Sequence, residues 1–409
     1  MPHIHGLRCK ECGRDYPAEP IYVCDYCFGP LEVAYDYDSI RKSISREKIK
    51  EGPLTIWRYD DLLPVSREKA VDIGAGMTPL IRATNLGREL GLNNLWIKND
   101  AANPTHSFKD RVVSVATTKA LEFEFDTVAC ASTGNLAGAT AAHGNKARMK
   151  TVVFLPENLE RGKIIGAAIF GNVVLVRGNY DDVNRLCSEL GDDRRWAFVN
   201  INMRPYYSEG SKSLGYEVAE QLGWHAPQHV VVPVASGSLF TKVWKGLNEF
   251  AELGLIDGVS TRMHIAQAEG CSPVARAMID GQTHPRPVVP NTVAKSLAIG
   301  TPADGIYSVA IANKSEGSGT AVPEDEVAAG MRLLAETEGI FTETAGGVVI
   351  STLKRLAQQG IIGPDEETVA LITGSGLKTL EVVESAIHPP VIDPTVESFD
   401  EVVTGMTGA

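Results

Sequence analysis

The chain has 409 residues, of which 44% are apolar and 22% charged, and its formal net charge is −12. This composition is typical of a globular protein, and the length suggests two or three domains. The densest basic pair, Arg194-Arg195, directly follows Asp192-Asp193, so no basic stripe is available for a nucleic-acid partner.

No uninterrupted apolar segment is long enough to span a bilayer, and no membrane partner is expected. The stretch from Met1 to Cys12 lacks the apolar region of a secretory signal. Three scattered cysteines beside one cluster do not form the pattern of a disulfide framework. We therefore expect a cytoplasmic protein.

The N-terminal residues contain two Cys-x2-Cys pairs, Cys9 with Cys12 and Cys24 with Cys27. Four thiolates on two tight knuckles suit tetrahedral zinc, which predicts a ribbon over residues 1–30 that the metal holds together. A nucleic-acid finger and a redox dithiol are the alternatives, and the acidic chain favours structural zinc over both. We expect zinc removal to loosen the segment through Cys27 and to leave the active site intact. Residues 31–75 have little strand pattern and are interpreted as a connecting arm, with a helix around Ile40–Lys50.

From Met77 onward, short β-branched runs alternate with segments of helical period, which predicts an α/β fold with mostly parallel, buried strands. The expected helices include Ser213–Leu222 and Glu324–Glu338. The expected strands include Thr127–Cys130, Thr151–Leu155, Asn172–Val176, His229–Val232 and Thr368–Ile372. The Pro-punctuated end of the chain, from His388, is interpreted as a surface tail.

One lysine, Lys109, stands among small hydroxyl residues in Asn103–Arg111, just after the strand-like run Leu95–Lys98. A partly desolvated lysine loses its proton more readily and becomes nucleophilic. Lys109 is therefore a candidate to form an imine with a carbonyl cofactor.

Three expected strands run into turns of small residues, at 131–135, 235–239 and 373–378. The first turn could hold a carboxylate on backbone amides, or could be an ordinary helix cap. The second could bind a phosphate in the same way, and the third is either a phosphate loop or a tight turn. Because ligands of open α/β sheets lie at the carboxyl ends of strands, one shared pocket is expected.

In their order and spacing, Asn103–Arg111, Ser132–Asn135, Lys295–Pro302 and Thr373–Lys378 resemble threonine synthase, a fold-type II pyridoxal phosphate (PLP) enzyme of the tryptophan synthase β type. The resemblance runs from about Met77 to Val383. It implies a large PLP-binding domain from 76–115 and 215–385, a small α/β domain from 116–214, and a tail from 386–409. It also implies conversion of O-phospho-L-homoserine and water to L-threonine and phosphate, and a homodimer.

The resemblance also assigns roles. Lys109 would bind PLP covalently and carry protons, Asn135 would face its phenolic oxygen and Thr373 its pyridine nitrogen. A hydroxyl such as that of Thr373 cannot keep this nitrogen protonated, which favours elimination chemistry. The cofactor phosphate would lie on Ala235, Ser236, Gly237, Ser238 and Leu239, and the substrate carboxylate on Ser132 and Thr133. The substrate phosphate would meet Asn202 and Arg204, with Ser211 and Lys212 as further candidates, although Arg204 could instead be a surface charge.

The chain departs from the family at His106, where glycine is frequent, and at Ser375. His106 could add an acid/base or phosphate contact, or could pack under the loop as a neutral imidazole. Glu343 could line the cofactor pocket or cap a helix. The departures leave open a paralogue that dehydrates serine or threonine, or that performs β-replacement on a phosphorylated amino acid. A catalytically inactive zinc-ribbon binding protein is the non-enzymatic alternative.

Overall fold

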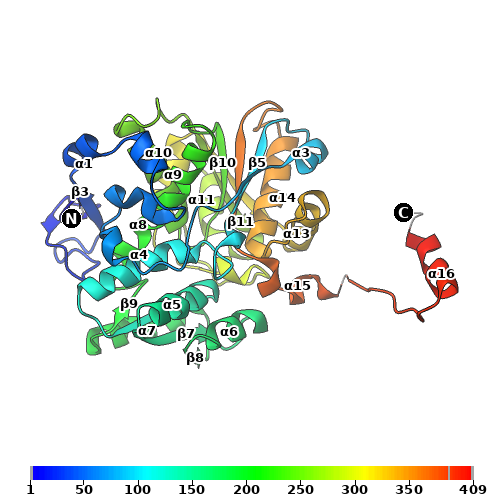
Figure 1. Ribbon diagram of the computed structural model, residues 1–409, viewed down its shortest axis with the longest axis horizontal. Coiled ribbons are helices and arrows are strands. Elements are labelled where there is room, and N and C mark those ends of the chain that lie inside the picture. Colours follow the sequence, from blue (N-terminus) through cyan, green and yellow to red (C-terminus); the bar gives the residue numbers. More distant parts are fainter. Residues whose placement is uncertain (1–2, 386, 407–409) are drawn as a thin grey trace.

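The computed structural model describes residues 3–385 and 387–406, and its strands form three separate sheets. Two larger sheets stand one above the other, and the small N-terminal sheet lies at the side of the body (Figure 1). The α/β architecture with mostly parallel sheets is confirmed. Positions 1–2, 386 and 407–409, which belong to the predicted ribbon and tail ranges, lie outside the described residues.

The N-terminal ribbon is a three-stranded antiparallel sheet in the order β2-β1-β3. Its strands are β1 (Ile4–Cys9), β2 (Asp15–Tyr16) and β3 (Leu31–Tyr35). The ribbon therefore extends beyond the predicted boundary at residue 30. Residues 31–35 were expected in the connecting arm, yet their alternating burial is that of a strand with one face on the core.

The large sheet has six strands in the order β12-β11-β10-β13-β5-β4, and all neighbours are parallel except β4 with β5. These strands are β4 (Leu80–Arg82), β5 (Leu95–Asn99), β10 (His229–Pro233), β11 (Arg262–Ala268), β12 (Gly319–Val322) and β13 (Thr368–Ile372). The central strands β10 and β13 are buried at every residue, because helices cover both faces of a parallel sheet.

The small sheet has four parallel strands in the order β8-β7-β6-β9. They are β6 (Thr127–Ala131), β7 (Lys150–Pro156), β8 (Asn172–Val176) and β9 (Ala197–Phe198). Every strand of the two larger sheets falls in the range predicted for its domain, while the division into domains itself stays a prediction.

Sixteen helices accompany these strands within the described residues. They are α1 (Tyr37–Ser43), α2 (Arg46–Lys50), α3 (Thr84–Leu90), α4 (Lys109–Glu122), α5 (Asn135–Lys146), α6 (Arg161–Ala168), α7 (Tyr180–Asp193), α8 (Arg204–Glu209), α9 (Lys212–Gln221), α10 (Ser238–Glu252), α11 (Pro273–Ile279), α12 (Gly305–Lys314), α13 (Glu324–Glu338), α14 (Thr344–Gln358), α15 (Glu381–Glu384) and α16 (Val396–Met406). The helix expected around Ile40–Lys50 is two short helices, because the chain is extended at Ile44 and Ser45 between them.

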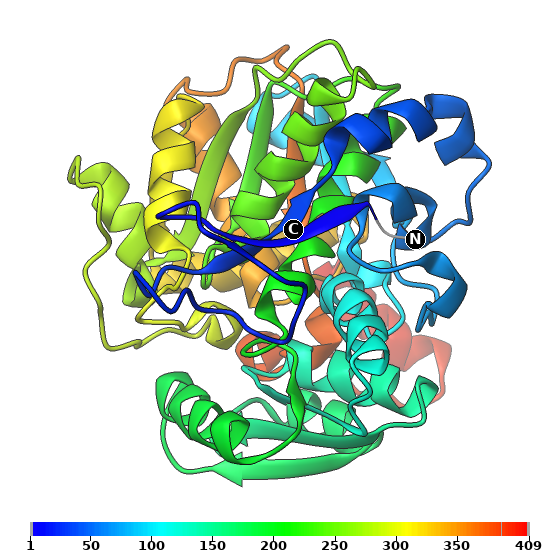
Figure 2. The ribbon, with the colours of Figure 1, turned by 90° about the vertical axis from the view of Figure 1, so that its left-hand side faces the viewer.

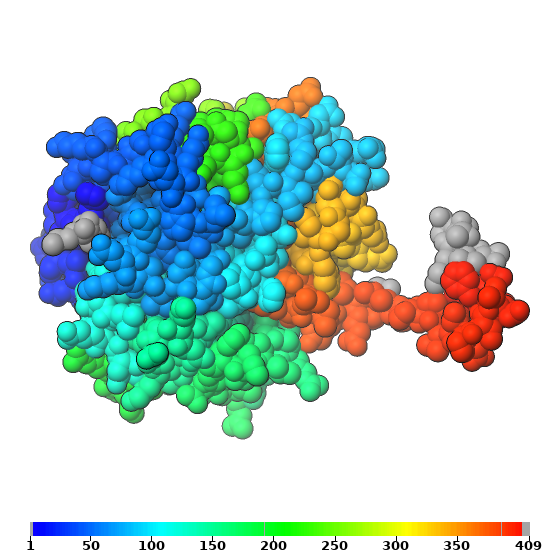
Figure 3. Space-filling model, viewed as in Figure 1, coloured from blue at the N-terminus to red at the C-terminus, as the bar shows by residue number. Residues whose placement is uncertain are grey.

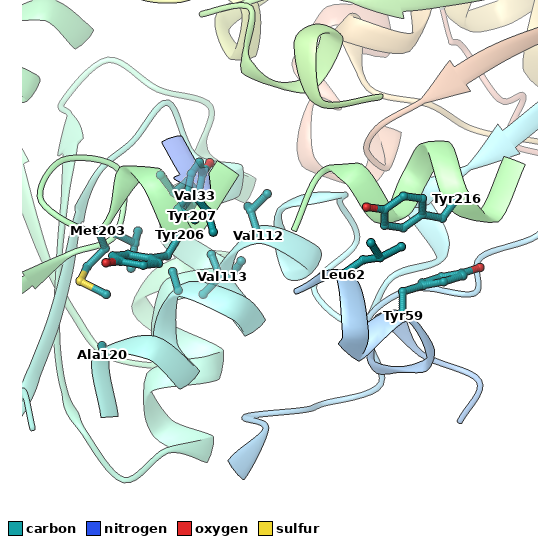
Figure 4. Close-up of a cluster of buried hydrophobic side chains, with 14 of the residues drawn as sticks. Val33, Tyr59, Leu62, Val112, Val113, Ala120, Met203, Tyr206, Tyr207 and Tyr216 are labelled. Carbon is teal, nitrogen blue, oxygen red and sulfur yellow. The ribbon is translucent and has the colours of Figure 1, made fainter. Parts of the chain in front are cut away.

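The short helix α8 connects the ribbon to the helix that begins at Lys109. Tyr206 and Tyr207 of α8 lie beside Val112 and Val113 of α4, and Val33 of the ribbon strand β3 is next to them (Figure 4). These side chains belong to one buried hydrophobic cluster, so the ribbon shares its core with the body. Figure 2 faces the ribbon, which lies across the side of the body above the small sheet.

The C-terminal segment, including α16, extends away from the body (Figures 1 and 3). Its large apolar side chains, such as Val391 and Val396, are exposed. In the described part of the chain, no helix is both long and apolar enough to cross a membrane.

Candidate active site

A cavity of about 230 Å³ lies at the carboxyl ends of β6, β10 and β13. All three predicted turns reach it, as expected for ligand sites in open α/β sheets. The predicted site residues that line it are Lys109, Ser132, Thr133, Asn135, Arg204, Ala235, Ser236, Gly237, Ser238, Leu239 and Thr373.

Lys109 is the first residue of α4, and its side chain is half-buried in the cavity wall. Its Nζ donates a hydrogen bond to the hydroxyl of Tyr207, 3.0 Å away. Burial lowers the pKa of Lys109 to about 8, although the charge of Glu343 acts in the opposite direction. A substantial fraction of this lysine is therefore the neutral, nucleophilic amine near physiological pH.

The loop that carries Lys109 is joined to the third turn by backbone hydrogen bonds. The amide of Phe108 donates to Thr373 O at 3.0 Å, and the amide of Ser375 donates to His106 O at 3.1 Å. His106 has φ of 60°, a conformation that glycine adopts easily and histidine tolerates. His106 is exposed, so of the two alternatives considered for it, packing under the loop is wrong.

A buried hydrogen-bond network surrounds Asn135 at the start of α5. The Asn135 amide nitrogen donates to both carboxylate oxygens of Glu343, at 3.0 and 2.8 Å, and its amide oxygen accepts from Lys378 Nζ at 3.1 Å. Glu343 also stands at the N-terminal cap position of α14, where its side chain makes no capping bond. Of the two roles considered for Glu343, the structure supports lining the pocket.

The turn from β10 to α10 has the geometry of a phosphate cradle. Gly237 has φ of +98°, and a Cβ there would lie 2.5 Å from Ser308 Oγ and 2.7 Å from Asp304 O, so only glycine fits. The first amides of the α10 helix have no acceptor within the helix and favour an anion. The buried hydroxyl oxygen of Ser296, also in the cavity wall, has no hydrogen-bond partner among the described residues. These groups fit a phosphorylated cofactor.

Of the three residues predicted for the substrate phosphate, one lines the cavity and two do not. Arg204 lines the cavity, and its side chain is 27% exposed and pairs with Asp304 at 2.8 Å, so it is not a surface charge. Asn202 donates to Trp196 O at 2.9 Å and is not in the cavity wall. Lys212 is fully buried between Glu209 and Glu249, at 2.7 and 3.0 Å, and is not in the wall either, although Ser211 is.

The cavity also contains residues that the sequence did not point to, notably Tyr22, Tyr180 and Tyr207. A helix that begins at Arg204 places Arg204 and Tyr207 on the same helix face. A helix prediction at Arg204 would therefore have identified Tyr207 as a neighbour of the site. Tyr22 belongs to the ribbon, and no local motif marks it.

The four ribbon cysteines converge at one point. The Sγ atoms of Cys9, Cys12, Cys24 and Cys27 all lie within 4.8 Å of one another. The hydroxyl of Tyr16 donates to Cys24 Sγ at 3.0 Å. Four sulfurs at this spacing fit tetrahedral zinc.

The sequence and fold were compared with known proteins. Residues 71–374 match the family model described as "Pyridoxal-phosphate dependent enzyme". Threonine synthase of Methanosarcina acetivorans is 38% identical over 98% of this chain and 99% of its own length. Threonine synthase of Methanocaldococcus jannaschii is 37% identical, covering 94% of this chain and 95% of its own length. The chain belongs to the threonine synthase family of PLP-dependent enzymes.

Solved structures support the fold assignment of this PLP-dependent enzyme. Diaminopropionate ammonia lyase from Escherichia coli superimposes with a TM-score of 0.64 at 17% identity, covering 77% of this chain and 88% of its own. Threonine deaminase isoform 2 from Solanum lycopersicum gives a TM-score of 0.62 at 22% identity, covering 86% and 89%. At such identities the likeness establishes the fold alone.

Proposed function

We propose that this protein converts O-phospho-L-homoserine and water to L-threonine and inorganic phosphate. One observation carries the proposal beyond family membership: Lys109, a reactive amine, and Arg204, a guanidinium suited to phosphate, line the same cavity. A substrate with an amino-acid end and a phosphate end requires such a pair of sites.

The residues that line the cavity fit PLP: Lys109 would hold its carbonyl carbon, and the turn from Ala235 to Leu239 would hold its phosphate through backbone amides. Asn135 and Thr373 would face the ring, and Ser132 and Thr133 would bind the substrate carboxylate. When bound, PLP supplies a carbonyl that reacts with amines and a conjugated ring that accepts electron density from the substrate α-carbon.

Lys109 is the group that moves protons in this proposal. Its neutral amine removes the proton from the substrate Cα, since its lowered pKa leaves it free of a proton often enough to act. Removal of a Cβ proton then lets phosphate leave from Cγ, and one of the removed protons returns to Cγ to make the methyl group. Water adds its hydroxyl at Cβ and gives up a proton, and Lys109 returns a proton to Cα. Tyr207, hydrogen-bonded to Lys109 Nζ, holds the amine in place between these transfers.

Arg204 would bind the leaving phosphate. Its planar guanidinium can donate two hydrogen bonds to one phosphate, and its pairing with Asp304 holds it at the cavity wall. Asn202 and Lys212 are left out of this role because neither lines the cavity.

We also propose that the ribbon cysteines bind zinc in a structural role and that the protein is a homodimer. The sulfur geometry supports the first point. The second rests on the family resemblance alone.

The reaction is tested by incubating purified, PLP-loaded protein with O-phospho-L-homoserine and measuring phosphate and threonine. Equal amounts of the two products are expected. L-threonine, L-serine and O-phospho-L-serine serve as alternative substrates for dehydration or β-replacement. Ammonia and a keto acid from threonine, with no phosphate from O-phospho-L-homoserine, would refute the proposal.

A further inference from the structure

Lys378, the last residue of the third turn, joins two segments of the active site although it does not line the cavity. Its Nζ donates to Asn135 Oδ1 at 3.1 Å and to Thr105 O at 2.5 Å. Asn135 is in the cavity wall, and Thr105 belongs to the loop that carries Lys109. Lys378 therefore stands behind the wall and contacts both segments from there.

The groups on either side of Asn135 determine which way its amide faces. A lysine ammonium only donates hydrogen bonds, so the atom that faces Lys378 is the amide oxygen. A carboxylate only accepts, so the amide nitrogen faces Glu343, with its two oxygens at 3.0 and 2.8 Å. Turning the amide over would set donor against donor and acceptor against acceptor, so one orientation is strongly favoured.

This orientation leaves an N–H bond of Asn135 for a ligand of the cavity. Seen from the nitrogen, the two oxygens of one carboxylate lie closer together than the two N–H bonds of an amide diverge. One N–H bond therefore serves both oxygens of Glu343, and the other can donate elsewhere. The phenolic oxygen of PLP, which Asn135 is proposed to face, is an acceptor for it.

The position of Lys378 is itself fixed by the loop that carries Lys109. The amide and the hydroxyl of Thr105 both donate to the carboxylate of Asp110, each at 2.7 Å, and Asp110 directly follows Lys109. Burial lowers the pKa of Lys378, while the charges of Glu343 and Asp110 act in the opposite direction. A continuous series of contacts thus runs from the residue after Lys109, through Thr105 and Lys378, to the side chain of Asn135.

We propose that Lys378 is a positioning residue, which holds the Asn135 amide so that its nitrogen faces the phenolic oxygen of PLP. The inference rests on the part of the proposed function in which Asn135 faces this oxygen, and it is independent of the substrate. A donor at this oxygen favours the form of the cofactor in which the oxygen is ionised. Lys378 acts through Asn135 and takes no part in proton transfer.

The test compares Lys378→Met with the wild type in the absence of substrate. Methionine removes the donor and keeps a long, flexible side chain. Two quantities are measured: the dissociation constant of PLP, by titration of the PLP-free protein, and the absorbance spectrum of the bound cofactor. Bound PLP absorbs in the visible when its ring oxygen is ionised and in the near ultraviolet when this oxygen is protonated. Lys354→Met, at an exposed position of α14, is the matched control.

Lys378→Met should raise the dissociation constant of PLP roughly tenfold and shift absorbance from the visible to the near ultraviolet, because the amide is no longer held toward the ring oxygen. Lys354→Met should change neither quantity. In an Asn135→Ala background, Lys378→Met should have no further effect, since Lys378 acts through Asn135. If Lys378→Met does not fold, Lys378→Gln replaces it, because glutamine is shorter by one bond and cannot make both contacts.

A wild-type dissociation constant and spectrum in Lys378→Met would overturn the inference. So would an equal rise of the dissociation constant when Lys378→Met is added to Asn135→Ala, because Lys378 would then act through its charge or through the fold. A wild-type protein that binds PLP but releases no phosphate from O-phospho-L-homoserine would instead refute the proposed function, and would leave the role of Lys378 intact.

Discussion

Lys109 experiences two opposing influences on its protonation. Burial lowers its pKa to about 8, from an ordinary value of 10.5, and the negative charge of Glu343 raises it. The same carboxylate holds the amide of Asn135 with both of its oxygens. Glu343 therefore positions Asn135 and adjusts the proton affinity of Lys109, the two residues that we propose to meet the cofactor.

At this scale we predict that Glu343→Gln lowers the pKa of Lys109 below about 8, because the nearby negative charge is removed. The neutral amine captures the cofactor, so the capture rate of PLP-free protein rises with pH through the pKa of Lys109. The midpoint, followed by the growth of visible absorbance, should fall by on the order of one pH unit.

The matched control is Glu336→Gln, a substitution of an exposed carboxylate that pairs with Arg332 on the surface of α13. It should leave the midpoint unchanged. A midpoint in Glu343→Gln that stays at the wild-type value, or rises, would contradict this account of Lys109.

Which residues the sequence could predict depends on how local their signals are. Lys109 and the three turns carry their meaning in a few adjacent residues, and they lie together as expected. Asn202 and Lys212 were chosen for their chemistry. However, the direction of a side chain depends on the rotation of its helix, and Lys212 at the start of α9 is directed to Glu249. Tyr22 has no local signal, because only the tertiary fold brings it to the cavity.

At the scale of elements, a buried charge cluster fixes α4 against its neighbours. Arg111 of α4 pairs with Asp100, which follows β5, and with Glu217 of α9, at 2.6 and 2.5 Å. Lys98 of β5 also pairs with Glu217, at 2.6 Å. All four side chains are almost completely inaccessible to water, and Lys109 lies two residues from Arg111. The cluster therefore holds the start of α4 rigidly.

This cluster predicts acid sensitivity. Burial alone would raise the pKa of Glu217, but Arg111 and Lys98 outweigh it and hold the pKa at about 2, below the ordinary 4.5. Because the pKa of the folded state is the lower one, the stabilisation is fully present above about pH 4.5 and is lost as the pH falls toward about 2.

Glu217→Gln should therefore lower the free energy of unfolding at neutral pH by about 3–5 kcal/mol, since buried Lys98 loses its charged partner and buried Arg111 loses one of its two. It should also flatten the dependence of stability on pH in the acid range. Urea unfolding of the variant across pH, beside the exposed-site control Glu189→Gln, measures both effects. Equal slopes for variant and wild type would show that Glu217 is not the titrating group.

The elements themselves were predicted best where pattern and packing agree. Glu324–Glu338 is a helix with the predicted bounds, because its apolar period matches its buried face. Leu31–Tyr35 was missed as a strand, since its pairing partner β1 lies far back in the chain and stabilises it only in the folded protein.

At the scale of the whole molecule, both larger sheets and the ribbon contribute residues to one cavity. Alternation of strands and helices predicted the parallel sheets and their shared edge. It could not predict the docking of the ribbon, because that depends on contacts such as Tyr206 with Glu19, between segments far apart in sequence. Zinc removal was expected to leave the active site intact. Because the ribbon supplies Tyr22 to the cavity wall, we now expect this only of the part that holds the cofactor.

We predict that removing zinc with a chelator weakens substrate binding and leaves cofactor binding intact. PLP absorbance should persist, because every group proposed to hold the cofactor lies outside the ribbon. KM for O-phospho-L-homoserine should rise, because Tyr22, a residue of the cavity wall, loses its fixed position. Metal content and protease cleavage near Cys27 report the loosening independently of activity. Loss of PLP absorbance on adding the chelator would contradict this prediction.

The central claim is that Lys109 performs the chemistry on a phosphorylated substrate, and Lys109→Ala tests it most directly. The measurement is phosphate release from O-phospho-L-homoserine by this variant, with the unfolding midpoint followed alongside. We predict loss of phosphate release by at least about a thousandfold with the fold retained, because the amine acts as nucleophile and proton carrier. A folded variant that still releases phosphate at the wild-type rate would contradict the account.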